Sequence, residues 1–169
     1  TINEESFFRY LKEKHGIDTI IDLMNNNEGG NVSKAGLKYV SVPLHSHGPK
    51  ESEWATIRLA LEAGNALVHC RHGADRTGAV VARWEVELGV KTPDEAHKDS
   101  LQYGFKRSSH PGYYPKDSSK YNPDPNRHLR TYILNSSPKT LDSVIKNASE
   151  ELPTRFPLAF RYWIRDSYY

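Results

Sequence analysis

Between a short apolar run and an amphipathic segment stands the sequence His69-Cys70-Arg71-His72-Gly73-Ala74-Asp75-Arg76-Thr77-Gly78, which holds the single cysteine of the chain. The apolar run 66–68 predicts a short buried strand, and the pattern of residues 77–88 predicts a helix. Cys70 is therefore expected where a strand ends and a helix begins. At such a point the backbone amides and the helix dipole favour a bound anion.

The spacing within this stretch predicts a phosphate-binding loop that carries its own nucleophile. Five residues separate Cys70 from Arg76, enough for the loop amides and the guanidinium to surround one tetrahedral oxyanion. A thiol near a helix N-terminus and a cation ionises more readily than a free cysteine, whose pKa is about 8.5. Arg76 can pair with two phosphate oxygens, and the hydroxyl of Thr77 can reach the sulfur or an attacking water. His69 is expected to order the loop from below, and the expected substrate-binding positions are Arg71, His72, Gly73, Ala74 and Gly78.

Hydrophobic periodicity predicts an α/β fold with a central, mainly parallel sheet and helices on both faces. The predicted strands span 18–23, 37–42 and 66–69, and residues 25–30 are predicted to form a loop rich in Asn and Gly. The predicted helices span 3–15, 51–63, 77–88, 92–103, 126–135, 138–151 and 156–165. Residues 104–126 lack periodicity and predict a long irregular loop.

Length and composition indicate one domain, 1–169, whose C-terminal part is helical from about residue 126. The net charge of +2 gives no strong nucleic-acid signal, and no apolar run is long enough to span a membrane. One cysteine excludes an internal disulfide. Because the chain begins at Thr1, we expect a processed form or an excised domain, and a cytoplasmic and a processed secreted location are both compatible with the sequence. We expect a monomer.

The loop resembles the signature of the cysteine-based protein tyrosine phosphatase superfamily, HCxxGxxRTG, at six positions: His69, Cys70, Gly73 and the run Arg76-Thr77-Gly78. The upstream order is similar to the small dual-specificity branch: a strand ending in Ile-Asp-Leu, a strand ending in Val-Pro-Leu, a helix, then Leu-Val-His-Cys. The similarity covers residues 17–103. It implies a dual-specificity-phosphatase-like fold and hydrolysis of phosphate monoesters through a phosphocysteine intermediate, with no cofactor and no metal.

The chain departs from the dual-specificity pattern at the general acid. That pattern places an aspartate on a movable loop upstream of the cysteine. This chain has no Asp between Asp22 and Asp75. Asp75 is the first candidate, because a Cys-x4-Asp-Arg loop resembles that of secreted bacterial tyrosine and lipid phosphatases and of myotubularins, where the loop aspartate has this role. The bacterial branch usually has Lys where this chain has Ala74. His45 or His47 is the second candidate, since an imidazole can donate a proton near neutral pH.

Several readings of the substrate and of the cysteine stay open at this point. The leading substrate is phosphotyrosine in a protein, with phosphoserine or phosphothreonine as additions, and a small phosphorylated substrate is also open. RNA 5′-triphosphatase is an alternative because the loop is also similar to cysteine-type RNA triphosphatases, which carry Asn at the position of Asp75. Phosphoinositides and inositol phosphates are another alternative, and a pseudophosphatase that binds phosphorylated ligands without turnover is the non-enzymatic one. A zinc site is disfavoured, because zinc would quench the thiolate and the spacings of its possible ligands are weak. These ligands are His45, His47, His69, Cys70 and His72. A buried structural thiol is disfavoured by the sequence context of the cysteine.

Overall fold

The computed structural model describes residues 4–45, 48–103, 105 and 127–138. Three parallel strands form the sheet in this part of the chain, in the order β2-β1-β3. They are β1 (Thr19–Asp22), β2 (Lys38–Ser41) and β3 (Ala66–His69). All residues of β1 and β3 are buried, whereas β2 lies at the sheet edge with both of its end residues exposed. The three predicted strands and their parallel arrangement are confirmed.

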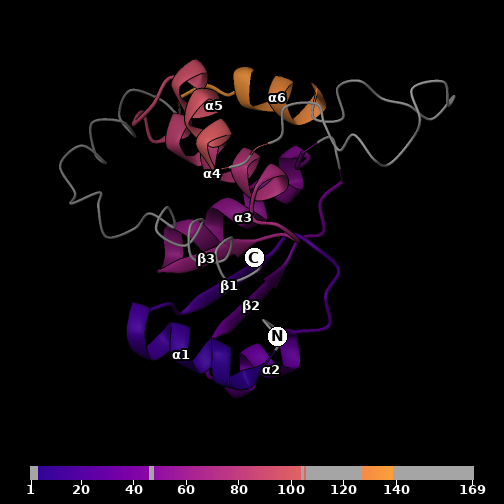
Figure 1. The fold of residues 1–169 in the computed structure, drawn as a ribbon, viewed down its shortest axis with the longest axis vertical. Coiled ribbons are helices and arrows are strands. Elements are labelled where there is room, and N and C mark those ends of the chain that lie inside the picture. Colours follow the sequence, from indigo (N-terminus) through magenta and orange to yellow (C-terminus); the bar gives the residue numbers. More distant parts are fainter. Residues whose placement is uncertain (1–3, 46–47, 104, 106–126, 139–169) are drawn as a thin grey trace, which may run out of the picture.

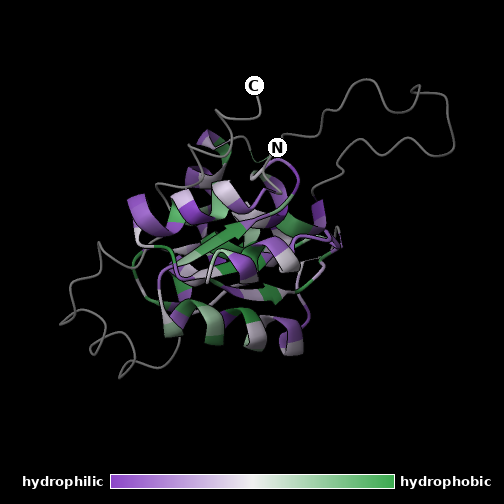
Figure 2. Ribbon diagram, turned by 90° about the horizontal axis from the view of Figure 1, so that it is seen from below, coloured by the Kyte–Doolittle hydropathy of each residue, from purple (hydrophilic) through white to green (hydrophobic). Residues whose placement is uncertain are grey.

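Helices cover both faces of the sheet (Figure 1). α1 (Glu5–His15) and α2 (Gly29–Lys34) lie on one face, and α3 (Glu51–Ala63) and α4 (Asp75–Glu87) on the other. Figure 2 shows the hydrophobic strands enclosed between these helical layers. The predicted α/β fold class with flanking helices is confirmed.

Successive side chains of a strand point to opposite faces of the sheet. Neighbouring residues of β1 therefore pack into the cores on the two faces. Ile20 joins a buried cluster that includes Phe8 of α1 and Val32 of α2. Ile21 joins a second cluster that includes Trp54 of α3 and Val80 of α4. The sheet is thus fixed from both sides, which holds the loops at its carboxyl edge in place.

Several helix ends differ from the sequence prediction by one or two residues, and two differences concern α2 and α4. Residues 25–30 were predicted as a loop, but α2 begins at Gly29 within that range. Its glycines have low helix propensity, so the packing of the fully buried Val32 is what stabilises this short helix. α4 begins at Asp75, two residues before the predicted start at Thr77. A carboxylate in the first turn of a helix is favoured by the helix dipole.

α5 (Pro93–Gln102) and α6 (Arg127–Leu134) pack on the outer side of α4. α5 begins as predicted, because Thr92 caps it with a reciprocal Glu95 bond and Pro93 occupies the first turn. The predicted helices 138–151 and 156–165 lie outside the described residues apart from position 138, as does the predicted loop 104–126 apart from Phe105. The single-domain assignment stays a prediction. Within the described ranges, no helix is long and apolar enough to cross a membrane.

Candidate active site

The carboxyl ends of the three strands meet at one edge of the sheet. Asp22, the last residue of β1, lies in register with Ser41 on β2 and with His69 on β3. In open parallel sheets, ligands bind just outside this edge. Cys70 follows His69 directly, so the fold places the single thiol of the chain at the position where such sheets bind their ligands.

The loop after β3 brings the thiol to the N-terminus of α4. Cys70 is 4% exposed and packs in the cluster beneath α3 and α4. Gly73 has φ of +65°, in the left-handed region, which lets the chain turn within the five residues 70–74 from the strand into the helix. The amides of the first helical turn therefore lie at the end of the loop that begins with Cys70. This arrangement suits a tetrahedral anion.

The first turn of α4 contains Asp75, Arg76 and Thr77. Asp75 and Arg76 are half-buried, so both are within reach of solvent at the mouth of the loop. Thr77 is 1% exposed, and within the described part of the chain its hydroxyl has no hydrogen-bond partner. A buried, unpaired hydroxyl costs free energy. It is therefore the expected place for a donor or acceptor supplied by a bound ligand.

Arg76 is tied to the loop that precedes α3. Its Nη1 donates a hydrogen bond to the backbone carbonyl of Leu44 at 3.2 Å. This contact fixes the position of the guanidinium group. The exposed His45 follows Leu44 directly and is therefore brought near the same loop. His47, the other histidine considered as proton donor, lies outside the described residues. The structure places Asp75 beside Arg76 in the helix turn and His45 one residue beyond the arginine's backbone partner.

The remaining predicted binding residues divide into two groups. Arg71 and His72 are exposed on the outer part of the loop, whereas Gly73 and Ala74 are buried. Gly78 packs against the ring of Phe105, since a Cβ atom at Gly78 would lie 3.1 Å from that ring. Gly78 thus serves close packing of α4 rather than an open surface.

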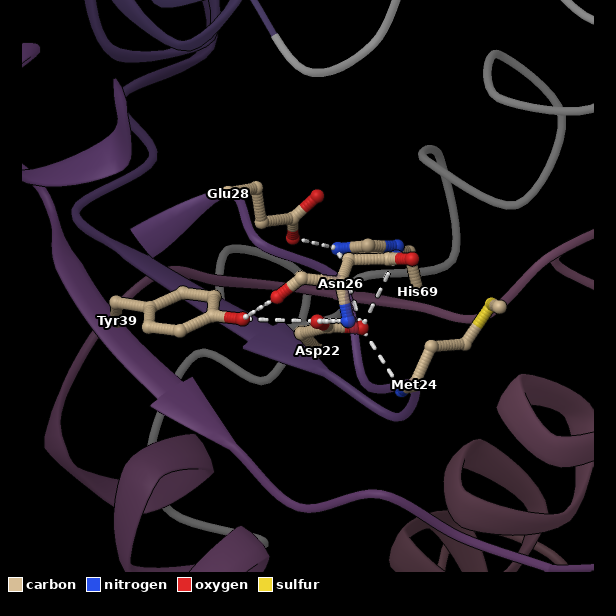
Figure 3. Close-up of polar contacts among 6 residues, drawn as sticks. All are labelled: Asp22, Met24, Asn26, Glu28, Tyr39 and His69. Carbon is tan, nitrogen blue, oxygen red and sulfur yellow. Dashed lines mark hydrogen bonds and ion pairs between the residues drawn. The ribbon is translucent and has the colours of Figure 1, made fainter. Parts of the chain in front are cut away.

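His69 is held from below the loop by a carboxylate that the sequence analysis did not identify. Its Nε2 atom lies 2.5 Å from a carboxylate oxygen of Glu28, and both side chains are almost fully buried (Figure 3). Burial alone lowers the pKa of His69, but the bond to Glu28, the charges of Glu28 and Asp22, and a bond to the backbone of Cys70 outweigh it. The net effect raises the pKa of His69 above its ordinary value.

Asp22 organises the other half of this buried network (Figure 3). Its carboxylate accepts hydrogen bonds from the backbone amide of Met24 at 2.8 Å and from the hydroxyl of Tyr39 at 2.8 Å. A weaker bond comes from the backbone amide of Asn26 at 3.3 Å. Burial, together with the bond to Asp22, raises the pKa of Tyr39 to about 12. Asp22 thereby joins edge strand β2 to the β1–α2 connection.

Asp22, Glu28 and His69 are also the described residues closest to a metal-binding arrangement, with one potential ligand atom each, all within 4.8 Å of one another. Their geometry favours a shared proton instead. Two atoms bound to one tetrahedral zinc stand about 3.3 Å apart, given zinc–ligand distances of roughly 2.0–2.2 Å. The 2.5 Å between His69 and Glu28 is too short for that and fits a direct hydrogen bond.

Three groups of the site were not predicted from the sequence: Glu28, Tyr39 and the carbonyl of Leu44. Glu28 is the only charged residue in the Asn- and Gly-rich segment 25–31, which was the available signal. A lone acid in a predicted loop is usually solvated, whereas this one is 2% exposed. A backbone carbonyl carries no residue-type signal at all, so the Leu44 contact had none.

Comparison with known proteins relates this geometry to phosphatases. No protein-family model matches the chain. The dual specificity protein phosphatase TpbA of Pseudomonas aeruginosa strain UCBPP-PA14 is 25% identical over 99 residues, which cover 56% of this chain and 45% of the relative. TpbA from strain PAO1 is 22% identical over 99 residues with the same coverage. The chain spans about half the length of the curated relatives that it matches.

Solved structures show the same fold. The crystal structure of a cysteine-to-serine variant of P. aeruginosa TpbA in complex with pTyr has a TM-score of 0.58 at 16% identity, over 87% of this chain and 82% of that chain. The chain is thus similar in sequence and in fold to a dual specificity protein phosphatase. PTPMT1, another solved structure with this phosphatase-like fold, has a TM-score of 0.51 at 17% identity, over 87% of this chain and 90% of that chain.

Proposed function

We propose that the chain hydrolyses phosphate monoesters through Cys70, with phosphotyrosine in proteins as the leading substrate. The observation that carries this proposal is the position of Cys70, which directly joins the carboxyl end of β3 to the loop that enters α4 with Arg76 in its first turn. Two comparisons support this substrate class. TpbA is a dual specificity protein phosphatase, and a variant of it has been solved in complex with pTyr.

In the first step, the Cys70 thiolate attacks phosphorus while the loop amides and Arg76 hold the phosphoryl oxygens. A sulfur–phosphorus bond forms, and the bond between phosphorus and the ester oxygen breaks. The leaving oxygen takes a proton from Asp75, the half-buried carboxyl in the first turn of α4. The fixed amides and the guanidinium stabilise charge on the phosphoryl group without reorganisation.

In the second step, water attacks the phosphocysteine. The sulfur–phosphorus bond breaks, the thiolate of Cys70 is restored, and the water proton passes to a base, a role that we assign to the ionised Asp75. The buried hydroxyl of Thr77 supports this step, because it has no partner within the described residues and is free to bond the departing sulfur or the water.

Turnover of para-nitrophenyl phosphate in the presence of a chelator tests the proposal. We expect activity that is lost on alkylation of Cys70 and in Cys70→Ser, while Cys70→Ser still binds a phosphotyrosine peptide. Full activity of Cys70→Ser would overturn the mechanism. Binding without turnover by the unmodified chain would instead identify a pseudophosphatase.

The substrate class is tested by a panel at matched concentrations. It contains a phosphotyrosine peptide, a phosphoserine peptide, phosphoinositides and 5′-triphosphorylated RNA. We expect the highest kcat/KM on the phosphotyrosine peptide. A preference for the lipid or the RNA would replace the protein-phosphatase assignment while leaving the role of Cys70 unchanged.

A further inference from the structure

Glu28 is a buried carboxylate that none of the proposed catalytic steps uses. It caps the start of α2, and its backbone carbonyl accepts a bond from the amide of Val32 at 3.0 Å. Val32 is fully buried in the cluster beneath the sheet. The backbone that carries Glu28 is therefore anchored, and its side chain reaches the ring of His69 from a defined position.

The charged and titratable groups around His69 come from every element that packs against it. β1 contributes Asp22, with an oxygen 4.0 Å from Nε2, and the N-terminus of α2 contributes Glu28 at 2.5 Å. The edge strand β2 contributes Tyr39, whose hydroxyl donates to Asp22. On its own element, the backbone of the neighbouring Cys70 also raises the pKa of His69.

This arrangement favours a protonated ring. The Nε2 atom of His69 lies 2.5 Å from the carboxylate of Glu28, and a carboxylate oxygen of Asp22 stands 4.0 Å away. An imidazole that carries a proton on both nitrogens is positively charged. The charge of His69 would then stand one residue from Cys70, where a cation stabilises a thiolate.

We propose that Glu28 is a positioning residue for the Cys70 reaction, because its carboxylate holds His69 charged and oriented beneath the phosphate-binding loop. The inference rests on the proposed function, since it assigns Glu28 a part in the same site. The effect passes from Glu28 to His69, and from His69 to Cys70, the next residue in the chain. Glu28 itself touches neither the substrate nor the reacting sulfur.

Alkylation of Cys70 by iodoacetamide between pH 5 and pH 9 tests the proposal without any phosphate substrate. Cys70 is the single cysteine, so the modified thiol is unambiguous. We expect Glu28→Gln to move the midpoint of the alkylation profile to higher pH by about one pH unit, as a nearby cation shifts thiol ionisation by that much or more. Gln keeps a hydrogen-bonding group in place, so the change isolates the charge.

Three further variants sharpen the result. Glu28→Asp retains the charge, so its alkylation midpoint should lie between those of the unmodified chain and of Glu28→Gln. If Glu28→Gln does not fold, Glu28→Asp still tests the proposal, because its midpoint should also move to higher pH, by a smaller amount. In a His69→Asn background, Glu28→Gln should have no additional effect on the profile. Glu62→Gln is the matched control, because Glu62 is half-exposed on α3 and pairs with Arg58 at 3.8 Å, and its profile should equal that of the unmodified chain.

Steady-state kinetics separates the two proposals. With para-nitrophenyl phosphate, Glu28→Gln should lower kcat about tenfold near pH 6 with little change in KM, and the loss should shrink at higher pH. A folded Glu28→Gln with an unchanged alkylation profile and unchanged kcat would overturn the role of Glu28. Absence of turnover in the unmodified chain, with the alkylation shift present, would instead reject the phosphatase function alone.

Discussion

The guanidinium of Arg76 donates a hydrogen bond to the carbonyl of Leu44 at 3.2 Å, which ties the first turn of α4 to the loop that leaves β2. The candidate phosphate clamp is thereby pre-oriented by backbone rather than by a side chain. This bond leaves the other guanidinium nitrogens available for phosphoryl oxygens. Holding the clamp before the substrate arrives reduces the ordering cost of binding.

Arg76→Lys tests this clamp. A lysine keeps the positive charge but cannot donate to Leu44 and pair with two phosphate oxygens at once. The loss of one charge-assisted hydrogen bond, about 1.5–3 kcal/mol, predicts a fall of roughly 10- to 100-fold in kcat/KM for para-nitrophenyl phosphate. Arg71→Lys, at an exposed loop position, is the control and should change kcat/KM less than Arg76→Lys does. An equal effect of both changes would contradict the assigned role.

Asp75→Asn tests the general acid through the leaving group. The variant should slow hydrolysis of a phosphotyrosine peptide much more than that of para-nitrophenyl phosphate, because nitrophenolate leaves without a proton. A loss of about 100-fold on the peptide is expected, within the range for general acid catalysis. Equal losses on both substrates would move the acid elsewhere, and His45→Ala and His47→Ala would then be compared in the same assay.

The pH dependence of stability follows from the raised pKa of His69, in which burial is opposed by Glu28, Asp22 and the Cys70 backbone. A raised folded-state pKa stabilises the fold fully below the unfolded value of about 6.5, and this contribution is lost as pH rises through the folded value. Glu28→Gln should therefore lower the free energy of unfolding more at pH 5.5 than at pH 9. Urea unfolding at the two pH values measures this, and a cost that grows with pH would contradict it.

Arg83 is expected to stabilise the fold at a place away from the site. Its guanidinium stacks on Trp54 at 4.5 Å and on Tyr132 at 5.2 Å, and it pairs with Glu87 at 3.2 Å. Arg83→Ala should lower the free energy of unfolding by about 2–4 kcal/mol, since it removes two stacks and leaves a buried carboxylate less well paired. Arg9→Ala removes a half-exposed pair on α1 and should cost no more than about 0.5 kcal/mol. Similar costs in urea unfolding would refute the difference.

The sequence was sufficient for the elements whose signals are local. The buried strands β1 and β3 were predicted from short apolar runs, and α5 from Thr92, Pro93 and Glu95, because alternation and capping are written in neighbouring residues. α2 was missed because its glycines oppose a helix, and contacts with distant residues, such as those of Val32, stabilise it.

The same distinction applies to the candidate site. The placement of Cys70 at the start of the loop and of Arg76 at its helical end follows from their spacing in the sequence. A strand, a short loop and a helix in this order are enough to produce it. The Glu28–His69 pair joins residues 41 positions apart in the chain, so its existence depends on how α2 packs beside the sheet. The burial of a single acid in a polar segment leaves no periodic pattern, and no local signal could have paired it with a histidine.

The most direct test of the account traps the covalent intermediate. The chain is mixed with a ³²P-labelled phosphotyrosine peptide, quenched in acid within the first turnover, and digested for mass spectrometry. We expect label on the peptide that contains Cys70, absent in Cys70→Ser and increased in Thr77→Ala, whose hydrolysis step is slowed. Turnover of the substrate without label on Cys70, or label that persists in Cys70→Ser, would contradict the mechanism.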